Sequence, residues 1–230
     1  MRIKIKFGPN SEMFDKQTND YVNGFIHSVL GEGNKWHDAF SPYSVSTMHG
    51  GVFDKESGMI QFPNGGHFVV SSDNEEFLSD LLCGLAMTSE AKLQTMKYLG
   101  FDSYSCGASS YFDVLRVENI RLKKDDKEIT FKDDGFIDTL LEHTKKKLKH
   151  NGIEDADAET IKFQPFHPEN WKVKLVKMKC GTEKENITPS STIMVVVRGK
   201  KVAREKILSL GLGSSTGSGF GFAITKNDKI

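Results

Sequence analysis

The sequence has few of the residues that hold together small secreted or metal-binding proteins. Its 230 residues include three cysteines, at positions far apart, and six prolines. Isolated cysteines form neither a disulfide framework nor a paired-cysteine metal site. The longest apolar run, residues 193–197, is far below the about 20 residues that a membrane span needs. The alternating residues 1–7 lack the apolar core of a signal peptide. We therefore expect a protein of the reducing cytoplasm, without a membrane segment.

The formal net charge is zero, but the charges are unevenly distributed. Residues 1–110 carry a net charge of −5, whereas residues 135–230 carry +6. A half with this excess of basic residues favours a polyanionic partner. Several lysines of segment 171–179 share one face of an expected strand, because side chains alternate along a strand. The basic clusters are Lys145–Lys147 with Lys149, then Lys172, Lys174, Lys177 and Lys179, then Arg198, Lys200, Lys201, Arg204 and Lys206.

The hydrophobic pattern predicts the same order of elements in each half of the chain. Apolar residues at i, i+3, i+4, i+7 and i+8 predict a helix over residues 18–30, and Asp73 or Asn74 is a suitable cap for a second helix through Leu85. Further helices are expected at 89–99, 135–149 and 200–210. Strands are expected at 1–7, 43–48, 58–62, 67–71, 112–122, 128–131, 171–179, 191–198 and 220–224.

Each half therefore reads β-α-β-β-α-β, the ferredoxin-like order. We predict an α+β protein with two tandem ferredoxin-like (RRM-like) domains, each an antiparallel sheet covered by two helices. The expected N-terminal domain covers residues 1–115, and the expected C-terminal domain, with the basic surface and the glycine-rich loop, covers residues 116–230.

The segment from residue 211 to residue 222 is dense in glycine, with five glycines in its first eleven positions. A dinucleotide-binding loop follows a strand and opens a helix, whereas this one follows an expected helix and opens a strand. A Walker loop ends in Gly-Lys-Ser/Thr, and no lysine follows here. Glycines let the backbone come close to a ligand, and its N–H groups and nearby hydroxyls are suitable donors to phosphate oxygens. The alternative is a structural role, in which the glycines only allow two segments of the chain to pack closely.

A second unusual segment, Trp36 to Ser46, follows the first expected helix and contains His37 and Pro42-Tyr43-Ser44-Val45-Ser46. Loops at the ends of rigid elements often carry catalytic groups. A lone histidine is more often structural or solvated, and no two histidines have the helical spacing of a zinc site.

Together these segments resemble the Cas6 family of CRISPR-associated endoribonucleases. The family has paired Gly-hydrophobic-Gly motifs near the C-terminus, and here these are Gly211-Leu212-Gly213 and Gly219-Phe220-Gly221. It also commonly has a histidine after the first helix followed by Pro-aromatic-x-x-Ser, here His37 and Pro42 to Ser46. The resemblance covers both ends of the chain and the tandem order of elements.

The resemblance implies cleavage of CRISPR repeat RNA without metal or another cofactor. The ribose 2′-hydroxyl attacks the adjacent phosphorus and leaves 2′,3′-cyclic phosphate and 5′-hydroxyl ends. The resemblance also implies that His37 is the acid–base residue, a role that suits an imidazole, and that Tyr21 orients or activates the hydroxyl. The basic residue expected after His37 is absent, and Lys35, His49 or a basic residue of the second domain could replace it. The RNA-binding residues it implies, together with the basic strand, are Gly211, Gly213, Ser214, Ser215, Gly217, Gly219, Gly221, Lys172, Lys174 and Arg198.

Two alternatives remain at this point. One is a non-catalytic RNA-binding subunit of a CRISPR effector complex, and the other is a ferredoxin-like enzyme unrelated to RNA. The resemblance also leaves open further CRISPR-associated proteins, or a second copy of the chain, as partners.

Overall fold

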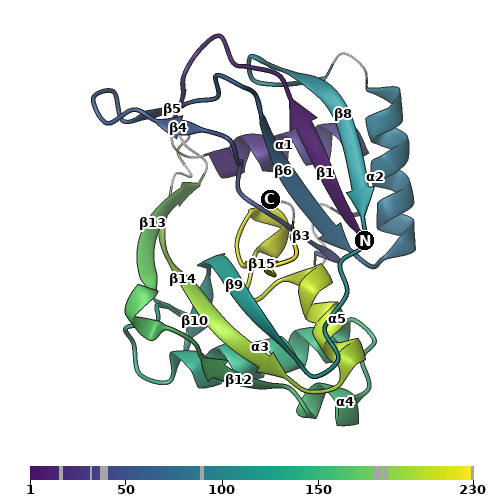
Figure 1. Cartoon of the computed structure of the whole chain (residues 1–230), viewed down its shortest axis with the longest axis vertical. Coiled ribbons are helices and arrows are strands. Elements are labelled where there is room, and N and C mark those ends of the chain that lie inside the picture. The colour runs from purple at the N-terminus through teal and green to yellow at the C-terminus, as the bar shows by residue number, and fades with distance from the viewer. Residues whose placement is uncertain are drawn as a thin grey trace.

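The chain folds into two antiparallel sheets with helices packed on them, and the C-terminal segment lies between the two halves (Figure 1). The computed structural model describes residues 1–15, 18–31, 33–36, 41–88, 91–178, 183 and 186–228. The expected α+β architecture of two ferredoxin-like halves is confirmed. In the described part of the chain, no helix combines the length and the apolar character that crossing a membrane requires.

The first half is built on a five-stranded sheet in the order β3-β6-β1-β8-β7. Strands β2, β5 and β4 form a small separate sheet at its side. The elements of this half are β1 (Arg2–Phe7), β2 (Phe14–Asp15), α1 (Thr18–Leu30), β3 (Tyr43–Val45), β4 (Val52–Phe53), β5 (Met59–Gln61), β6 (Gly66–Ser72), α2 (Glu75–Met87), β7 (Lys92–Leu93) and β8 (Met96–Tyr104).

The alternation in β1 decides which face of this sheet is covered. Ile3, Ile5 and Phe7 are at most 2% exposed and belong to the core under the helices. Phe25 and Ile26 of α1 belong to the same core. Because side chains alternate along a strand, the lysines between these apolar residues point to the opposite face, which is turned toward the second half.

The predicted cap of α2 is present. The Asn74 side-chain oxygen accepts a hydrogen bond from the backbone N–H of Phe77 at 2.8 Å. This bond satisfies one of the free N–H groups at the start of the helix.

The second half has a sheet in the order β12-β14-β9-β15, with β13 paired to β14 as well. Its central strands β14 and β9 are antiparallel, as are β15 and β9. The elements are β9 (Phe112–Ile120), β10 (Leu122–Lys124), β11 (Lys127–Ile129), α3 (Phe136–His150), α4 (Asp155–Glu159), β12 (Lys162–Pro165), β13 (Lys172–Met178), β14 (Asn186–Arg198), α5 (Lys201–Leu210) and β15 (Phe222–Ile224).

Three predictions about elements were wrong or incomplete. The helix expected over 89–99 is absent, because β7 and the start of β8 form an antiparallel pair there. In that pair Leu93 and Met96 are buried in the first core, so tertiary packing overrides local helix propensity. In the second half the sequence did not predict α4 and β12. Strand β12 pairs with the C-terminal part of β14. Strand β13 pairs with the N-terminal part of β14, and the two strands form a long hairpin.

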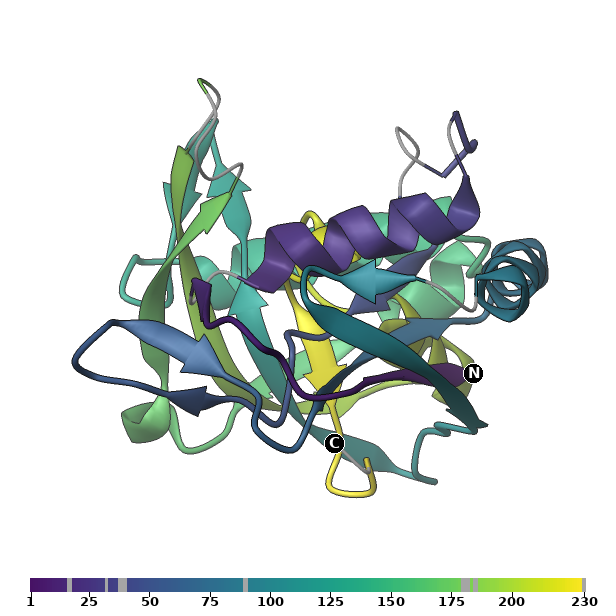
Figure 2. The same cartoon turned by 90° about the horizontal axis from the view of Figure 1, so that it is seen from above.

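The two halves share a buried interface. The Arg2 guanidinium reaches from β1 into the second half, where it donates to the Ala223 carbonyl at 2.5 Å and pairs with Asp228. The Ser71 hydroxyl donates to the Leu208 carbonyl at 2.9 Å. Figure 2 shows α1 running across the C-terminal segment. The expected domain boundary between residues 115 and 116 lies inside β9. We propose that the two domains instead meet in the connection 105–111, which joins β8 to β9.

Candidate functional site

The glycine-rich segment forms a closed loop between α5 and β15. The Leu212 N–H donates to the Gly221 carbonyl at 2.8 Å, and a Cβ on Gly221 would lie 1.7 Å from the Leu212 oxygen. Left-handed backbone with φ between +65° and +80° occurs at Gly211, Gly213, Gly219 and Gly221. Glycine is therefore required by the folding of the loop itself, since other residues rarely adopt these angles.

The loop also packs against the first half. A Cβ on Gly217 would lie 2.4 Å from the Ser41 hydroxyl oxygen. The Asn19 side-chain amide at the start of α1 donates to the Gly219 carbonyl at 3.3 Å. The structural alternative raised for this glycine pattern, a close approach of chain segments, thus applies at several of its positions.

On its other side the loop is held by the second half. The Arg121 carbonyl accepts from the Ser214 N–H at 2.9 Å, and the Arg121 guanidinium donates to the Ser215 hydroxyl at 3.3 Å. The ammonium of Lys147 on α3 donates to the Thr216 hydroxyl at 2.9 Å. The loop therefore ties both halves together, and its serines remain available to line cavities.

A cleft of about 450 Å³ opens between the halves beside the loop. Its walls come from Asn19 of α1 and Met48 after β3, and on the other side from Asn119 of β9 and Lys174 of β13. Lys174 is exposed, so this basic residue of the predicted strand reaches the interdomain cleft.

The other two predicted basic contacts lie elsewhere. Lys172 lines a smaller cavity of about 230 Å³ with Arg116. The Arg198 guanidinium lies over the ring of Phe112, 5.3 Å from the ring centroid. Lys174 pairs with Ser190 on β14, eight positions before Arg198, which at about 3.3 Å per residue is about 26 Å along the strand. The structure does not bring these three residues to one place.

Tyr21 is half-buried against the first core. Its ring meets Phe14 edge-on, with 5.6 Å between the ring centroids. Its position on α1, two residues after Asn19, keeps it near the glycine loop, although the ring packs on β2.

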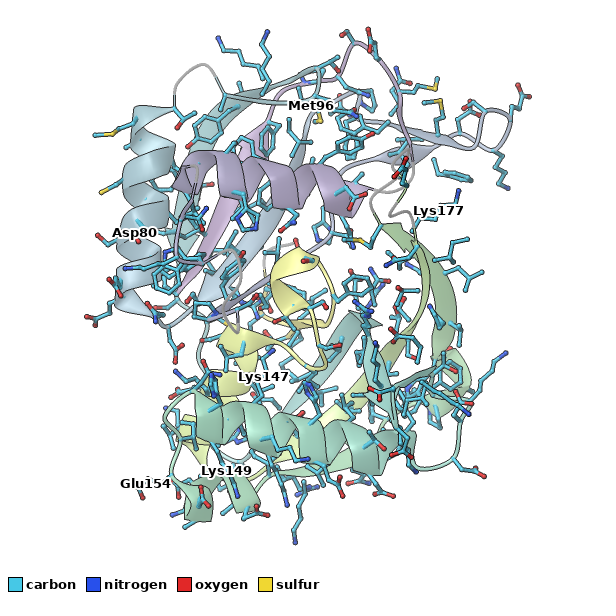
Figure 3. All side chains as sticks on the ribbon, turned by 180° about the vertical axis from the view of Figure 1, so that it is seen from behind. Asp80, Met96, Lys147, Lys149, Glu154 and Lys177 are labelled. Carbon is cyan, nitrogen blue, oxygen red and sulfur yellow. The ribbon has the colours of Figure 1, made fainter. Side chains whose placement is uncertain are left out.

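Lys35 lies beyond the other end of α1, beside α2. Its ammonium pairs with Glu76 and lies 3.9 Å from Asp80, which is labelled in Figure 3. The indole N–H of the neighbouring Trp36 donates to Asp80 at 2.9 Å. Lys35 is therefore engaged with carboxylates and is separated from Tyr21 by most of the length of α1.

His49 lies beside His67 on the sheet face turned toward the second half. The two backbones exchange hydrogen bonds of 2.8 and 3.1 Å, and the ring centroids are 5.4 Å apart. Both Nε2 atoms are buried without a hydrogen-bond partner in the described structure. Burial lowers the pKa of His49 and lowers the pKa of His67 to about 4, with the positive charge of Lys4 acting in the same direction. Both rings are therefore neutral at pH 7.

His37 lies outside the described residues, as does Lys179 of the basic strand. Of the four catalytic candidates, the structure therefore places Tyr21, Lys35 and His49, and it places them at three separate locations.

Two of the three basic clusters are partly neutralised. Lys145 and Lys149 on α3 pair with Glu159 of α4 at 2.7 and 3.0 Å, and Arg204 is buried against Asp113. In the cluster on β13, Lys174 is the lysine that lines the cleft.

Three titratable residues of these cavities and sheet faces were not among the site residues predicted from the sequence. Lys147, which is buried, and His143, which is half-buried, lie on α3 beside the glycine loop, and the half-buried His67 lies beside His49. Lys147 occurs seven positions after the buried Leu140 and therefore lies on the apolar face of α3. A lysine at an apolar position of the helix is the feature of the sequence that could have identified it.

The second half matches a known family. Residues 114–224 match the family model described as CRISPR associated protein Cas6, C-terminal. Among curated proteins the search found no match.

Solved structures share the whole fold. They include a RAMP protein described as binding different RNA substrates, at 15% identity and a TM-score of 0.80, covering 98% of this chain and 99% of that one. A Cas6-related protein from Pyrococcus furiosus has 16% identity and a TM-score of 0.75, with 100% and 99% covered. A CRISPR-associated Cas6 protein has 17% identity and a TM-score of 0.73, with 98% of each chain covered. At these identities the likeness shows the fold alone.

The fold and the interdomain loop thus define a protein of two tandem ferredoxin-like domains joined through a glycine-rich segment. Because residues 114–224 also match the Cas6 C-terminal model, this part of the chain belongs to the Cas6 family of CRISPR-associated proteins.

Proposed function

We propose that this protein is a metal-independent endoribonuclease that cleaves CRISPR repeat RNA. The observation that carries the proposal is the position of the glycine-rich loop, in a chain that matches the Cas6 C-terminal model. The loop contacts the start of α1 through Asn19 and the segment after His37 through Ser41. Ser41 follows His37 by four residues, and four extended residues span at most about 14 Å. This short separation along the chain supports a proposed role for His37 close to the loop.

The cleft beside the loop supplies the RNA-binding surface in this proposal. Lys174 offers a positive charge to phosphates, and Asn19 and Asn119 offer side-chain amides to sugars and base edges. Binding through phosphates depends strongly on salt, because counterions are released.

The chemistry needs one nucleophile that the substrate itself supplies. A base removes the proton of the ribose 2′-hydroxyl, whose oxygen then forms a bond to the adjacent phosphorus. The bond from phosphorus to the 5′-oxygen breaks, and an acid returns a proton to that oxygen. The ends are a 2′,3′-cyclic phosphate and a 5′-hydroxyl. His37 is the proposed acid–base residue, and one such group contributes roughly 10²–10⁴-fold in rate.

One observation favours a non-catalytic RNA-binding subunit as the second candidate. Lys35 is paired with Glu76 and Asp80, and the ring of Tyr21 packs on Phe14. The Lys35 ammonium is therefore engaged by carboxylates, and Lys35 and Tyr21 lie at separate locations.

The test uses end-labelled repeat RNA incubated with the protein in EDTA. We expect one cut, a cyclic phosphate end and no cleavage of RNA carrying a single 2′-deoxy nucleotide at the cut. His37→Ala should reduce the rate at least about 100-fold and leave RNA binding intact. The matched control is His167→Ala, because that exposed histidine lies between β12 and β13, pairs with Glu169 and lines neither the interdomain cleft nor the cavity beside the loop. Tight binding without cleavage by the unmodified protein would leave the RNA-binding subunit as the assignment.

A further inference from the structure

A cavity of about 300 Å³ lies between α3 and the glycine-rich loop, on the other side of the loop from the interdomain cleft. Several of its lining residues carry hydroxyl, imidazole or ammonium groups. Its polar side chains are Ser41, His143, Lys147, Ser214, Ser215, Thr216 and Ser218. Figure 3 labels Lys147 on α3, next to the yellow C-terminal segment.

Lys147 is an unusual residue for a protein interior. It is 7% exposed, and its ammonium donates to the Leu210 carbonyl at 2.7 Å and to the Thr216 hydroxyl at 2.9 Å. No carboxylate of the described residues forms an ion pair with it. An ammonium has three donors, and both partners are neutral. The charge is therefore uncompensated, and burial lowers the pKa of Lys147 to about 7.

His143 lies one helical turn before Lys147, so the two side chains share a face of α3. The Nδ1 atom of His143 is buried and has no hydrogen-bond partner within the described structure. Burial, together with the positive charges of Lys147 and Lys146, lowers the pKa of His143. A neutral imidazole has one donor and one acceptor nitrogen, so this ring can donate a hydrogen bond once a ligand oxygen is present.

The loop side of the cavity adds hydroxyl groups from Ser214 and Ser215. The Ser214 hydroxyl donates to the Arg121 carbonyl at 3.1 Å. The Ser215 hydroxyl accepts from the Arg121 guanidinium at 3.3 Å, so its own O–H can donate to a ligand. Arg121 is itself paired with Glu128 at 2.8 Å, so its charge is already balanced. The uncompensated charge in this cavity is that of Lys147.

Several hydroxyls, a histidine and an unpaired ammonium around one small cavity match a ligand with several oxygens and a negative charge. A phosphate group has this chemistry, and its oxygens accept hydrogen bonds from different directions at once. A metal ion is disfavoured by the ammonium in the wall. Ser41, in that wall, follows the proposed acid–base residue His37 by four positions in the sequence.

We propose that this cavity binds a phosphate of the RNA chain close to the cut, with Lys147 and His143 as its ligands. The proposal rests on the function proposed above and adds a binding site on α3 to it. Lys147 then has two roles: it holds the glycine loop, and it balances the charge of the phosphate.

The experiment measures affinity for repeat RNA that carries a 2′-deoxy nucleotide at the cut, so that binding is separated from cleavage. Lys147→Met should weaken binding about 10- to 100-fold, as expected for a charge-assisted hydrogen bond, and lower the salt dependence by about one phosphate contact. The matched control is Lys146→Met, which removes the same charge from an exposed position of the same helix. In the unmodified protein, affinity should rise as the pH falls through about 7, while Lys147→Met should not show this rise.

A second variant guards against a simple loss of structure. Lys147→Met removes two hydrogen bonds to the loop, so its unfolding in urea is measured as well. His143→Gln leaves those bonds in place and should still weaken RNA binding about 3- to 10-fold, the effect of about one neutral hydrogen bond. If His143→Gln binds as tightly as the unmodified protein, or if Lys147→Met equals Lys146→Met, the proposal is wrong.

Inorganic phosphate serves as the probe for a free ion. We expect it to shift the NMR signals of the His143 ring, and we expect the RNA to displace it. If phosphate binds and RNA does not displace it, the cavity is a site for free phosphate and the RNA assignment is overturned. These outcomes differ from failure of the proposed function, in which the unmodified protein itself neither binds nor cuts repeat RNA.

Discussion

Replacing Gly221 by alanine tests whether the glycine-rich loop needs its glycines for its own folding. The backbone at this position has φ of +65°, and the added Cβ would lie 1.7 Å from the Leu212 carbonyl oxygen. A left-handed conformation costs an alanine about 1–2 kcal/mol. Moving the two segments apart also weakens the 2.8 Å hydrogen bond from the Leu212 N–H to the Gly221 carbonyl, worth about 1 kcal/mol, and strains a packed site by about 1–3 kcal/mol. We expect Gly221→Ala to lower the free energy of unfolding by about 3–6 kcal/mol.

The matched control is Gly58→Ala in the turn between β4 and β5. Gly58 has a similar φ of +70°, and a Cβ there would meet nothing within 4 Å. This change should cost about 1 kcal/mol, because only the backbone conformation opposes it. Urea denaturation followed by tryptophan fluorescence measures both. Equal losses of stability in the two variants would refute the steric argument, and the glycines would then be better explained by contact with a ligand.

Three further predictions concern buried charge and the cleft. Because burial lowers the pKa of His67 to about 4, the unfolded chain takes up the proton first, and stability present above pH 6.5 is lost as the pH falls toward 4. For a half-exposed ring we expect a loss of about 1 kcal/mol, which His67→Gln should abolish in urea titrations at the two pH values. Arg204→Met leaves the buried Asp113 carboxylate unpaired and should cost about 3–5 kcal/mol, whereas Lys201→Met, at an exposed pair, should cost less than about 1 kcal/mol in the same thermal melt. Lys174→Ala should weaken RNA binding in filter assays and lower its salt slope by about one, and an unchanged slope would remove Lys174 from the RNA path.

Local pattern was enough to predict most elements of the fold. The helix over 18–30 agrees with α1, and the expected strand at 67–71 lies within β6. These segments have a clear period of 3.6 or 2, and their apolar faces are the buried ones. The prediction failed at 89–99, where a short hairpin is stabilised by burying Leu93 and Met96 in the first core. No local signal marks such a contact, because its partners are distant in sequence.

The candidate site was predictable in part. The glycine pattern located the loop that joins the two halves, and the alternating lysines of β13 located a residue of the cleft, Lys174. The separation of Lys174 from Arg198 could not be predicted, because it depends on the pairing register of β13 and β14. In that register Lys174 lies opposite Ser190, whereas Arg198 lies opposite a residue of β12.

The sequence by itself determined the order of helices and strands, the tandem ferredoxin-like fold and the position of the glycine-rich loop. These features follow from hydrophobic period and from residue types that few backbones accommodate. Only the tertiary structure decided which charges remain free. It paired Lys35 and Lys149 with carboxylates and buried Lys147 beside His143 without one. The physical reason is that the state of a charged group depends on burial and on neighbours from other elements, and folding alone brings those neighbours together.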